Sequence, residues 1–596
     1  MNLRKLRIFA RAFSMLGAHK VPVLIGCLCV PASVALSLWI PHVVGAAIEQ
    51  IRRIGAHEAD EASAVSALVT SCLFFAGLAL ADGFVKFVAR SNLIVASRRV
   101  EEQLKNELVG HIARLPAQWY DKARTGDLIS RLTQDVELVR FVVGPAVLHG
   151  GIALLTVPLG LWLMAQISVT LMLVTIASFT LLLISMLTVM PRLEKHSKAA
   201  QEAISAISQR SQEAFAGIRV LISFARGTDE VTRMRTLSRD YLGCNLRLVR
   251  LRALMDLLVQ VFRNLVVLGA LVLGARAAIR GEITLGGLFE FLLLLGAMVW
   301  PLISIGWILA AFHRAIAAAE RIEEIFAIAP EAQTGITKDL QGEIEVRNLT
   351  FTYAGQMQPA LRGVSFQLHP GQKLGLVGPV GSGKSTLLLL LLRLYEPPPG
   401  TIFVDGVDIL ALHPRTLRDH FALAPQDPFL FSDTIAGNVA FGNAGNLDAV
   451  PEFLHAAVAD AALDSDLTAI QGGLEALVGE RGITLSGGQK QRTSLARALA
   501  SGRRALILDD TLSAVDVATE RRILARLERH RGRTTLIAAH RLSAVRDADL
   551  ILVLERGEVT ARGTHEELLK ADGYYSDTWR RQQEEHALEG EAEEIA

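Results

Sequence analysis

The sequence predicts a multidomain protein, with an all-α transmembrane domain of six helices followed by an α/β domain. Two observations predict this division. Up to about residue 310 the apolar residues form long runs, and beyond about residue 343 they fall into pieces of strand or helix length. Six of the long runs reach the roughly 20 residues that a helix needs to cross the hydrocarbon core of a bilayer. The boundary is expected near residue 330.

Composition and charge exclude several classes of protein. Of the 596 residues, 51% are hydrophobic and 20% are charged, which excludes disordered and fibrous chains. The 61 Lys and Arg residues nearly cancel the 60 Asp and Glu residues, so the net charge of +1 provides no global field to attract nucleic acid. The four cysteines have no zinc-like spacing. Neither a nucleic-acid partner nor a cysteine-bound metal is therefore expected.

The expected spans are residues 21–46, 64–88, 141–165, 167–190, 257–279 and 284–310. The first run is too long for the core of a signal peptide, so it is expected to be retained as a helix. Lys and Arg gather in the loops after the second and fourth spans, which should therefore be cytoplasmic. The chain is thus expected to be a multi-pass integral membrane protein with both termini in the cytoplasm.

The two inner loops keep a helical period, so the spanning helices are expected to continue into the cytoplasm. Each loop reverses at a short distinct stretch, residues 119–127 and 217–224, where it could contact another domain or simply turn. Within the spans, Asp82 and Lys86 lie four residues apart and are expected to pair. For Arg263, an aqueous cavity, snorkelling and pairing with another helix all stay open.

A strand, a glycine loop and a helix follow one another in the second half. Residues 374–377 form a short apolar strand, and a Leu-rich helix extends to about residue 395. The loop between them contains Gly378, Gly381, Ser382, Gly383, Lys384, Ser385 and Thr386. Its glycines let backbone N–H groups close round phosphates, Lys384 supplies a positive charge, and Ser385 can ligate Mg²⁺. The sequence therefore predicts a phosphate-binding loop.

Three further features surround this loop in the sequence. The apolar strand at residues 505–509 ends in Asp509, where phosphate-loop NTPases hold Mg²⁺. Gln426 follows a strand-like stretch at residues 421–424. A glycine turn opens a helix whose N-terminus suits a phosphate. That turn consists of Leu485, Ser486, Gly487, Gly488 and Gln489. It is too far along the chain to belong to the same loop, so it is expected to serve a second nucleotide face.

These motifs are followed by Ser513, Ala514, Val515, Asp516 and His540. In this order, and over nearly the whole chain, the sequence resembles an exporter-type ABC half-transporter. Within that family the chain resembles the multidrug-type bacterial heterodimeric subunits with a degenerate ATP site. The resemblance implies six spans fused to an α/β P-loop ATPase, the ABC nucleotide-binding domain. The implied parts are a transmembrane domain at 1–325, a linker at 326–342, a nucleotide-binding domain at 343–580 and an acidic tail at 581–596.

The resemblance also implies roles for single residues. Tyr353 would stack on adenine, and Gln426 would contact Mg²⁺ and water. Residues 485–489 would be the signature loop, which closes on ATP bound by the partner subunit. His540 would sense the γ-phosphate, and Asp516 would lie in the loop that joins the two sites.

One residue departs from the family pattern, which places a catalytic glutamate directly after the Mg²⁺-binding aspartate. That position is Asp510 here, whose carboxylate would sit about 1 Å back from the attacking water, a displacement that can cost about 100-fold in rate. The chain's own site is therefore expected to hydrolyse ATP weakly. The alternative is a slow homodimer in which Asp510 is a working base. Glu480 resembles the contact to the coupling helices, which would be the two inner turns.

The resemblance thus implies an ATP hydrolase coupled to transport in the bacterial cytoplasmic (inner) membrane, with its ATPase domain in the cytoplasm. It would export amphipathic drug-like or lipid-like compounds, with ATP and Mg²⁺ as cofactors, membrane lipid around it and a second half-transporter as partner. A different partner chain is expected rather than an identical one. A homodimeric exporter, a nucleotide-gated regulatory subunit and a dedicated peptide or siderophore transporter are the alternatives.

Overall fold

The computed structural model describes residues 4–55, 61–443, 451–479, 482, 484–513, 515–530 and 532–595. The chain divides into two compact units. The first unit consists of Met1–Ala113 and Thr125–Ile328, and the second consists of Arg114–Arg124 and Ala329–Ala596. The short segment Arg114–Arg124 therefore belongs by its contacts to the second unit, although it interrupts the first in the sequence.

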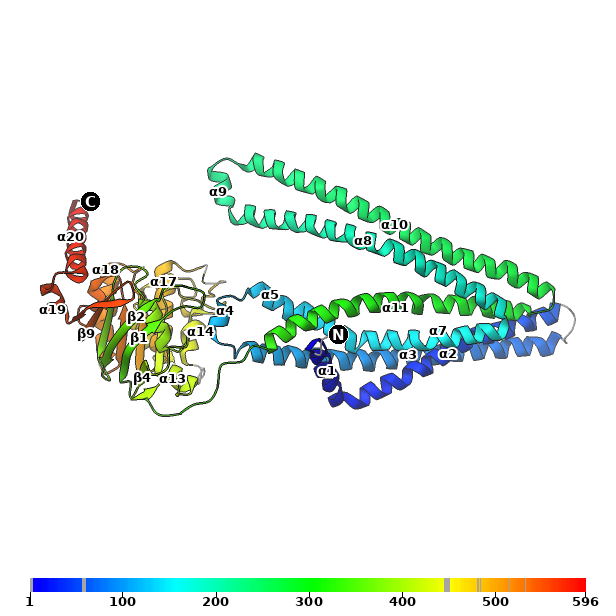
Figure 1. Ribbon diagram of the computed structural model, residues 1–596, viewed down its shortest axis with the longest axis horizontal. Helices are drawn as coiled ribbons and strands as arrows, with labels where there is room; N and C mark the ends of the chain where they lie inside the picture. Colours follow the sequence, from blue (N-terminus) through cyan, green and yellow to red (C-terminus); the bar gives the residue numbers. More distant parts are fainter. Residues whose placement is uncertain are drawn as a thin grey trace. The chain divides into compact units, whose positions relative to one another are not determined.

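The first unit is helical (Figure 1). Its helices are α1 (Arg4–Leu16), η1 (Gly17–His19), α2 (Lys20–Gly55), α3 (Glu61–Ile112), α5 (Thr125–Ser130), the π-helix η2 (Arg131–Asp135), α6 (Val136–Val143), α7 (Pro145–Ile167), α8 (Val169–Ala216), α9 (Ile218–Ser223), α10 (Gly227–Ile279) and α11 (Leu285–Phe326). Helices α3, α8 and α10 have 52, 48 and 53 residues, more than twice the roughly 20 that a bilayer requires. The prediction that spanning helices continue beyond the membrane is confirmed.

Five helical stretches in the described residues are long and apolar enough to cross a membrane. They are Arg7–Ile54, Val65–Ile112, Thr125–Ile167, Gly227–Ile279 and Leu285–Phe326. The expected span at 167–190 lies on α8, where the described residues provide only the shorter apolar stretch Val169–Leu181. The predicted count of six spans is therefore not confirmed, because the side chains of residues 182, 183, 186 and 187 lie outside the description.

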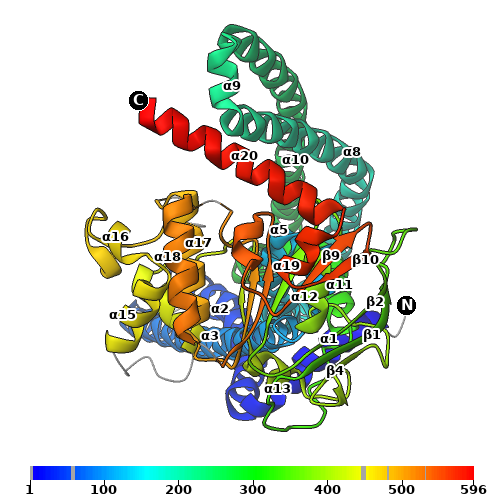
Figure 2. The same cartoon turned by 90° about the vertical axis from the view of Figure 1, so that its left-hand side faces the viewer.

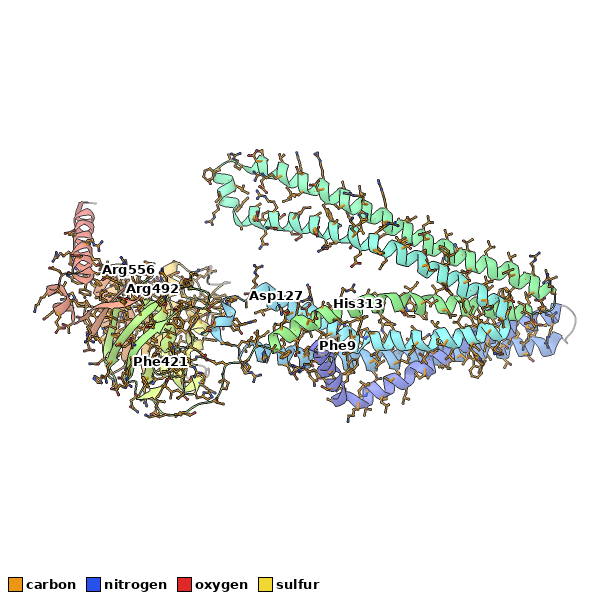
Figure 3. The ribbon with its side chains drawn as sticks, viewed as in Figure 1. Phe9, Asp127, His313, Phe421, Arg492 and Arg556 are labelled. Carbon is orange, nitrogen blue, oxygen red and sulfur yellow. The ribbon has the colours of Figure 1, made fainter. Side chains whose placement is uncertain are left out.

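Helices α2, α7 and α11 enclose a common apolar core, to which Leu38, Met164 and Phe291 contribute. Helices α2 and α11 cross so closely that a Cβ atom at Gly286 would collide with the Gly45 carbonyl oxygen. Helix α1, which carries Phe9 (Figure 3), packs on α11. The ring of Phe9 stacks there on that of Phe312. Helices α8 and α10 run side by side and are joined by α9; we call them the α8–α10 hairpin (Figure 1).

The charged residues noted within the spans have partners close by. Lys86 Nζ lies 2.6 Å from Asp82 Oδ2, so the predicted ion pair is confirmed. Arg263 Nη2 donates a hydrogen bond of 2.8 Å to Gln260 Oε1, three residues earlier on the same helix. Its nearest polar partner is therefore local rather than on another helix.

The second unit contains two sheets and a set of short helices (Figure 2). One sheet has the order β2-β1-β4-β5 and the other has the order β10-β9-β3-β8-β7-β6. The strands are β1 (Ile344–Phe351), β2 (Leu361–Leu368), β3 (Lys373–Val377), β4 (Ile402–Val404), β5 (Val407–Asp408), β6 (Phe421–Ala424), β7 (Ala505–Asp509), β8 (Thr534–Ala538), β9 (Leu550–Glu555) and β10 (Glu558–Gly563). The helices are α4 (Ala117–Tyr120), α12 (Lys384–Leu391), α13 (Pro414–His420), α14 (Ile435–Ala440), η3 (Phe441–Asn443), α15 (Pro451–Asp460), α16 (Asp464–Leu467), η4 (Gly473–Glu475), α17 (Gly487–Ala500), α18 (Val517–Leu527), η6 (Glu528–His530), η7 (Leu542–Val545), α19 (His565–Lys570) and α20 (Tyr574–Ile595).

The strands β3, β6, β7, β8 and β9 are parallel, and both faces of their sheet are covered. Along β7 the side chains alternate: Ala505 and Ile507 join one apolar cluster, and Leu506 and Leu508 join the other. Strands buried on both faces appear in a sequence as short continuous apolar runs. In such sheets ligands bind outside the carboxyl ends of the strands.

Two expected boundaries differ from the structure. The helix after the glycine loop ends at Leu391 rather than near residue 395, because Arg393 has a left-handed φ of +49° and donates a hydrogen bond to the Leu412 carbonyl oxygen. Residues 581–595, expected to be an acidic tail, continue helix α20, which begins at Tyr574. The chain is therefore helical on both sides of residue 580.

Candidate nucleotide-binding site

The glycine loop joins the end of β3 to the start of α12. Gly378, Gly381 and Gly383 have φ values of +148°, +79° and +104°, which residues with a side chain rarely adopt. A Cβ atom at Gly383 would lie 2.7 Å from the Ala360 carbonyl oxygen, so the loop has no room for one there. Ser382 Oγ is buried and has no hydrogen-bond partner among the described residues. This compact loop fits a phosphate that receives backbone and hydroxyl donors.

Lys384 places a positive charge under the loop. Its Nζ donates hydrogen bonds to the carbonyl oxygens of Gly378, at 2.8 Å, and Pro379, at 3.1 Å. Burial lowers the pKa of Lys384, and the nearby carboxylates of Asp510 and Asp509 oppose this shift. Burial of a charged group is costly unless it is paired, so a buried ammonium group that donates its hydrogen bonds to neutral carbonyl oxygens fits an anionic ligand.

Asp509 ends β7 beside the loop, and its Oδ1 accepts a hydrogen bond of 3.0 Å from Ser385 Oγ. Burial raises the pKa of Asp509; the Ser385 hydroxyl, Lys384 and His540 lower it, and Asp510 raises it further. The described residues contain no group of three or more His, Cys, Asp or Glu that could hold a metal alone. One carboxylate and one hydroxyl suit Mg²⁺, which usually shares its coordination between a few protein oxygens and substrate phosphates.

Asp510 follows Asp509 in a left-handed backbone conformation, with φ of +46°. Its backbone N–H donates a hydrogen bond of 2.8 Å to the Ala538 carbonyl oxygen on β8, which ties this residue to the sheet. Its side chain is partly exposed. The carboxylates of Asp509 and Asp510 therefore both lie at the carboxyl end of β7, one buried and one accessible.

His540 and Gln426 also follow parallel strands of this sheet. His540 lies two residues after β8, near enough to Asp509 to lower its pKa. Gln426 lies two residues after β6, is exposed, and forms no side-chain hydrogen bond to the other site residues in the described part of the chain. The parallel register thus brings the glycine loop, Asp509, Asp510 and His540 to one edge of the sheet. Phe421, at the opposite, amino end of β6, is buried inside the unit (Figure 3).

The aromatic residue expected to contact adenine lies beside the glycine loop. Tyr353 Oη donates a hydrogen bond of 3.1 Å to Thr386 Oγ1, and its ring makes an edge contact with Tyr395 at 5.1 Å. Tyr395 Oη in turn donates a hydrogen bond of 2.7 Å to Asp121 Oδ2, on the segment Arg114–Arg124. Burial, with the hydrogen bond to Asp121, raises the pKa of Tyr395 to about 12. Asp121, in the first inner turn, thus contacts Tyr395, and both residues belong to the second unit.

The predicted signature loop lies on a separate part of the unit, at the start of α17. Ser486 caps this helix, since its Oγ accepts from the Gln489 N–H and its own N–H donates to Gln489 Oε1 at 2.9 Å. A Cβ atom at Gly487 would meet nothing within 4 Å, so the helix N-terminus is open. Leu485 is buried beneath it. Over the described ranges no hydrogen bond joins these residues or Gly488 to the glycine loop, and their role as a second nucleotide face stays a prediction.

Asp516 has a defined local role. Its carboxylate caps α18 by accepting a hydrogen bond of 2.8 Å from the Thr519 N–H, and this bond lowers the pKa of Asp516. Ala514 and Glu480, both named from the sequence, lie outside the described residues. The contacts of Tyr395 with Asp121 were missed by sequence reasoning, because no motif marks either residue.

Comparison with known proteins gives the family. The ABC transporter transmembrane region matches residues 23–302, and the ABC transporter domain matches residues 361–513. The chain is 33% identical over 572 residues to the probable multidrug resistance ABC transporter ATP-binding/permease protein YheI of Bacillus subtilis, covering 94% of both chains. It is 36% identical to the multidrug resistance-like ATP-binding protein MdlA of Escherichia coli, covering 85% of this chain and 86% of that one.

A third relative is the ATP-dependent lipid A-core flippase of Photobacterium profundum, which is 34% identical over 85% of this chain and 87% of its own length. The fold also matches a solved structure of a bacterial Atm1-family ABC exporter with ATP bound, with a TM-score of 0.78. That match covers 94% of this chain and 98% of the other at 24% identity, so it concerns the fold alone. Because both family regions match and relatives above 30% identity cover most of its length, this chain belongs to the ABC transporter family, with the transmembrane region and ATP-binding domain of an exporter half-transporter in one polypeptide.

Proposed function

We propose that this chain is one subunit of a dimeric, ATP-driven exporter that moves amphipathic drug-like or lipid-like compounds across the bacterial cytoplasmic membrane. The multidrug and lipid A flippase names of its relatives support this substrate class. Both termini and the ATP-binding domain lie in the cytoplasm in this proposal, because the basic loops do.

A partner chain is needed to cover the tip of the α8–α10 hairpin. Phe215, Ile222 and Phe224 lie at or next to α9 and are 75%, 72% and 73% exposed. The tip belongs to an inner loop, so these apolar side chains would face water in a lone chain. Exposed apolar patches of this kind mark interaction sites. A second half-transporter that receives the tip would bury them.

The same partner would complete the two ATP sites. Lys384 and the backbone N–H groups of the glycine loop would bind the β- and γ-phosphates, and Ser385 with Asp509 would hold Mg²⁺. Bound Mg²⁺ neutralises charge on the phosphates. The open N-terminus of α17, at residues 485–489, would close on the ATP that the partner binds.

The observation that carries the proposed asymmetry is the residue after Asp509, which is Asp510 and not a glutamate. The chain's own site would therefore mainly bind ATP, while its signature loop would complete a competent site on a different partner. In the alternative, Asp510 works as the base in a homodimer.

Transport can be tested with the full chain in proteoliposomes, alone and together with a second half-transporter that has a glutamate directly after its Mg²⁺-binding aspartate. The expected result is ATP-dependent movement of a fluorescent amphiphile or a fluorescent phospholipid, lost in Lys384→Ala. ATP binding without substrate-stimulated turnover, alone or with the partner, would contradict the exporter and favour a nucleotide-gated regulatory subunit. Movement of a peptide or siderophore but of neither amphiphile would contradict the substrate class.

A further inference from the structure

The segment that carries His540 leaves the sheet just before that residue. Ala538 still belongs to β8, where its carbonyl oxygen accepts the Asp510 N–H, and the Ala539 N–H still donates to the Leu376 carbonyl oxygen at 3.1 Å. From His540 onward, the side chain of Gln582 on α20 takes the place of a neighbouring strand.

Gln582 binds the segment through both ends of its amide. Its Nε2 donates a hydrogen bond of 2.9 Å to the His540 carbonyl oxygen, and its Oε1 accepts one of 3.0 Å from the Leu542 N–H. A primary amide offers a donor and an acceptor, as a peptide group does, so it satisfies two alternate backbone positions. In the reversed orientation the amide NH₂ would face the Leu542 N–H and the amide oxygen would face the His540 carbonyl oxygen, so the two backbone partners determine the orientation of the amide. Leu542 is only 1% exposed, so its N–H needs a partner.

The opposite side of the same segment is held by Glu520 on α18. Arg541 is extended, with φ of −87° and ψ of 122°, and its Nη1 donates 2.8 Å to Glu520 Oε2 and 2.9 Å to the Val515 carbonyl oxygen. Ser543 Oγ donates to the other carboxylate oxygen, Glu520 Oε1. Residues 540 and 542 are thus held by α20, and residues 541 and 543 by α18. Without the amide of Gln582, only one side of the segment would be fixed.

We propose that Gln582 is a positioning residue of the nucleotide site, which fixes the backbone of His540 so that its imidazole faces the phosphates. The inference rests on the proposed function and on the role that the family resemblance implies for His540, which is to sense the γ-phosphate. Through Gln582, helix α20 would help the nucleotide site to distinguish ATP from ADP, although α20 contains neither the glycine loop nor the signature motif. Loss of the amide would leave the imidazole on a looser segment and weaken that distinction.

The test uses the full-length chain in lipid nanodiscs with Mg²⁺. Gln582→Leu removes both hydrogen bonds, and Gln582→Glu keeps the acceptor for the Leu542 N–H but loses the donor for the His540 carbonyl oxygen. Gln583→Leu is the matched control, because Gln583 is the exposed neighbour on the same helix. His540→Ala provides the reference for a site without the imidazole. Two quantities are measured: hydrogen exchange of residues 540–543, and the ratio of ADP to ATP dissociation constants from displacement of a fluorescent ATP analogue.

In Gln582→Leu, exchange at Leu542 is expected to rise by about 10-fold, as for one lost hydrogen bond, and the ratio is expected to fall toward the His540→Ala value. In Gln582→Glu, protection of Leu542 should largely remain while the ratio still falls, a separation that a merely structural role would not produce. Gln583→Leu should match wild type in both.

Unchanged exchange at Leu542 in Gln582→Leu would overturn the inference. So would an unchanged ratio in Gln582→Leu, if His540→Ala lowers it. If His540→Ala itself leaves the ratio unchanged, the γ-phosphate role that the family resemblance implies for His540 is wrong. Faster exchange in Gln582→Leu would in that case still support the clamp on the segment.

Discussion

Replacing Asp510 by Glu is expected to raise ATP turnover at the chain's own site. The backbone N–H of Asp510 is bound to the Ala538 carbonyl oxygen at 2.8 Å, and its φ of +46° leaves little freedom. The Cα atom therefore stays where the sheet holds it, and the added methylene group of glutamate extends the carboxylate outward. The glycine loop and Asp509 are untouched, so ATP binding should stay the same.

The size of the effect follows from that extension. A carboxylate about 1 Å out of place can lose about 100-fold in rate, which corresponds to about 2.7 kcal/mol of barrier. Asp510→Glu should recover up to about that factor in kcat with an unchanged KM for ATP. The assay is steady-state phosphate release by the purified chain in lipid with saturating Mg²⁺ and ATP, alone and with the second half-transporter of the transport test. Lys384→Ala measures the contaminating background.

Asp510→Asn is the matched control, since it keeps the shape of the side chain and removes the base. If Asp510 is a weak base, wild type and Asp510→Asn should turn over at similar low rates when the chain is alone. The pair with the second half-transporter should then hydrolyse ATP whether residue 510 is Asp or Glu. Robust turnover by the lone wild type, abolished in Asp510→Asn and not raised in Asp510→Glu, would refute this reasoning and indicate a homodimeric pump.

Three further changes are expected to act through single contacts. Gly378→Ala should abolish binding of a fluorescent ATP analogue, because the new Cβ atom would collide with the Leu554 carbonyl oxygen and Gly378 has a φ of +148°. Unchanged affinity would contradict this steric reason. Burial lowers the pKa of His420, so the stability that its neutral form contributes is present above the unfolded value of about 6.5 and is lost as the pH falls below it. The thermal unfolding midpoint should therefore fall between about pH 7.5 and about pH 5.5, and it should fall less in His420→Leu than in the wild type. An equal fall in both proteins would exclude this histidine as the cause. Asp135→Ala removes a buried carboxylate that accepts hydrogen bonds of 2.8 and 2.5 Å from Arg321. This change should lower the free energy of unfolding by about 1–3 kcal/mol. An unchanged thermal unfolding midpoint in detergent would show that the pair does not contribute to stability.

Much of the nucleotide-binding part could be predicted because its central strands are buried on both faces. The apolar runs 374–377, 421–424 and 505–509 correspond to β3, β6 and β7 to within one residue. The glycine loop was predicted because its conformation depends on adjacent residues, three of them glycines with positive φ. The end of α12 was wrong by about four residues, since Arg393 turns the chain through contacts with the distant Leu412.

The transmembrane part was predicted less completely. Its long helices follow from apolar length alone, and the continuation of α3, α8 and α10 beyond the membrane was predicted from their period. The closest approach between helices, at Gly45 and Gly286, could not be predicted, because a glycine within an apolar run gives no sign of which helix it meets.

By itself, the sequence determined the division into a membrane part and an ATP-binding part, the phosphate loop and the unusual Asp510, because each depends on neighbouring residues and their order. Only the tertiary structure decided which distant side chains support that site. The amide of Gln582 reaches His540 across 42 residues, and Asp121 reaches Tyr395 across 274. Such contacts depend on how helices dock against a sheet, and packing of this kind leaves no local pattern in the sequence.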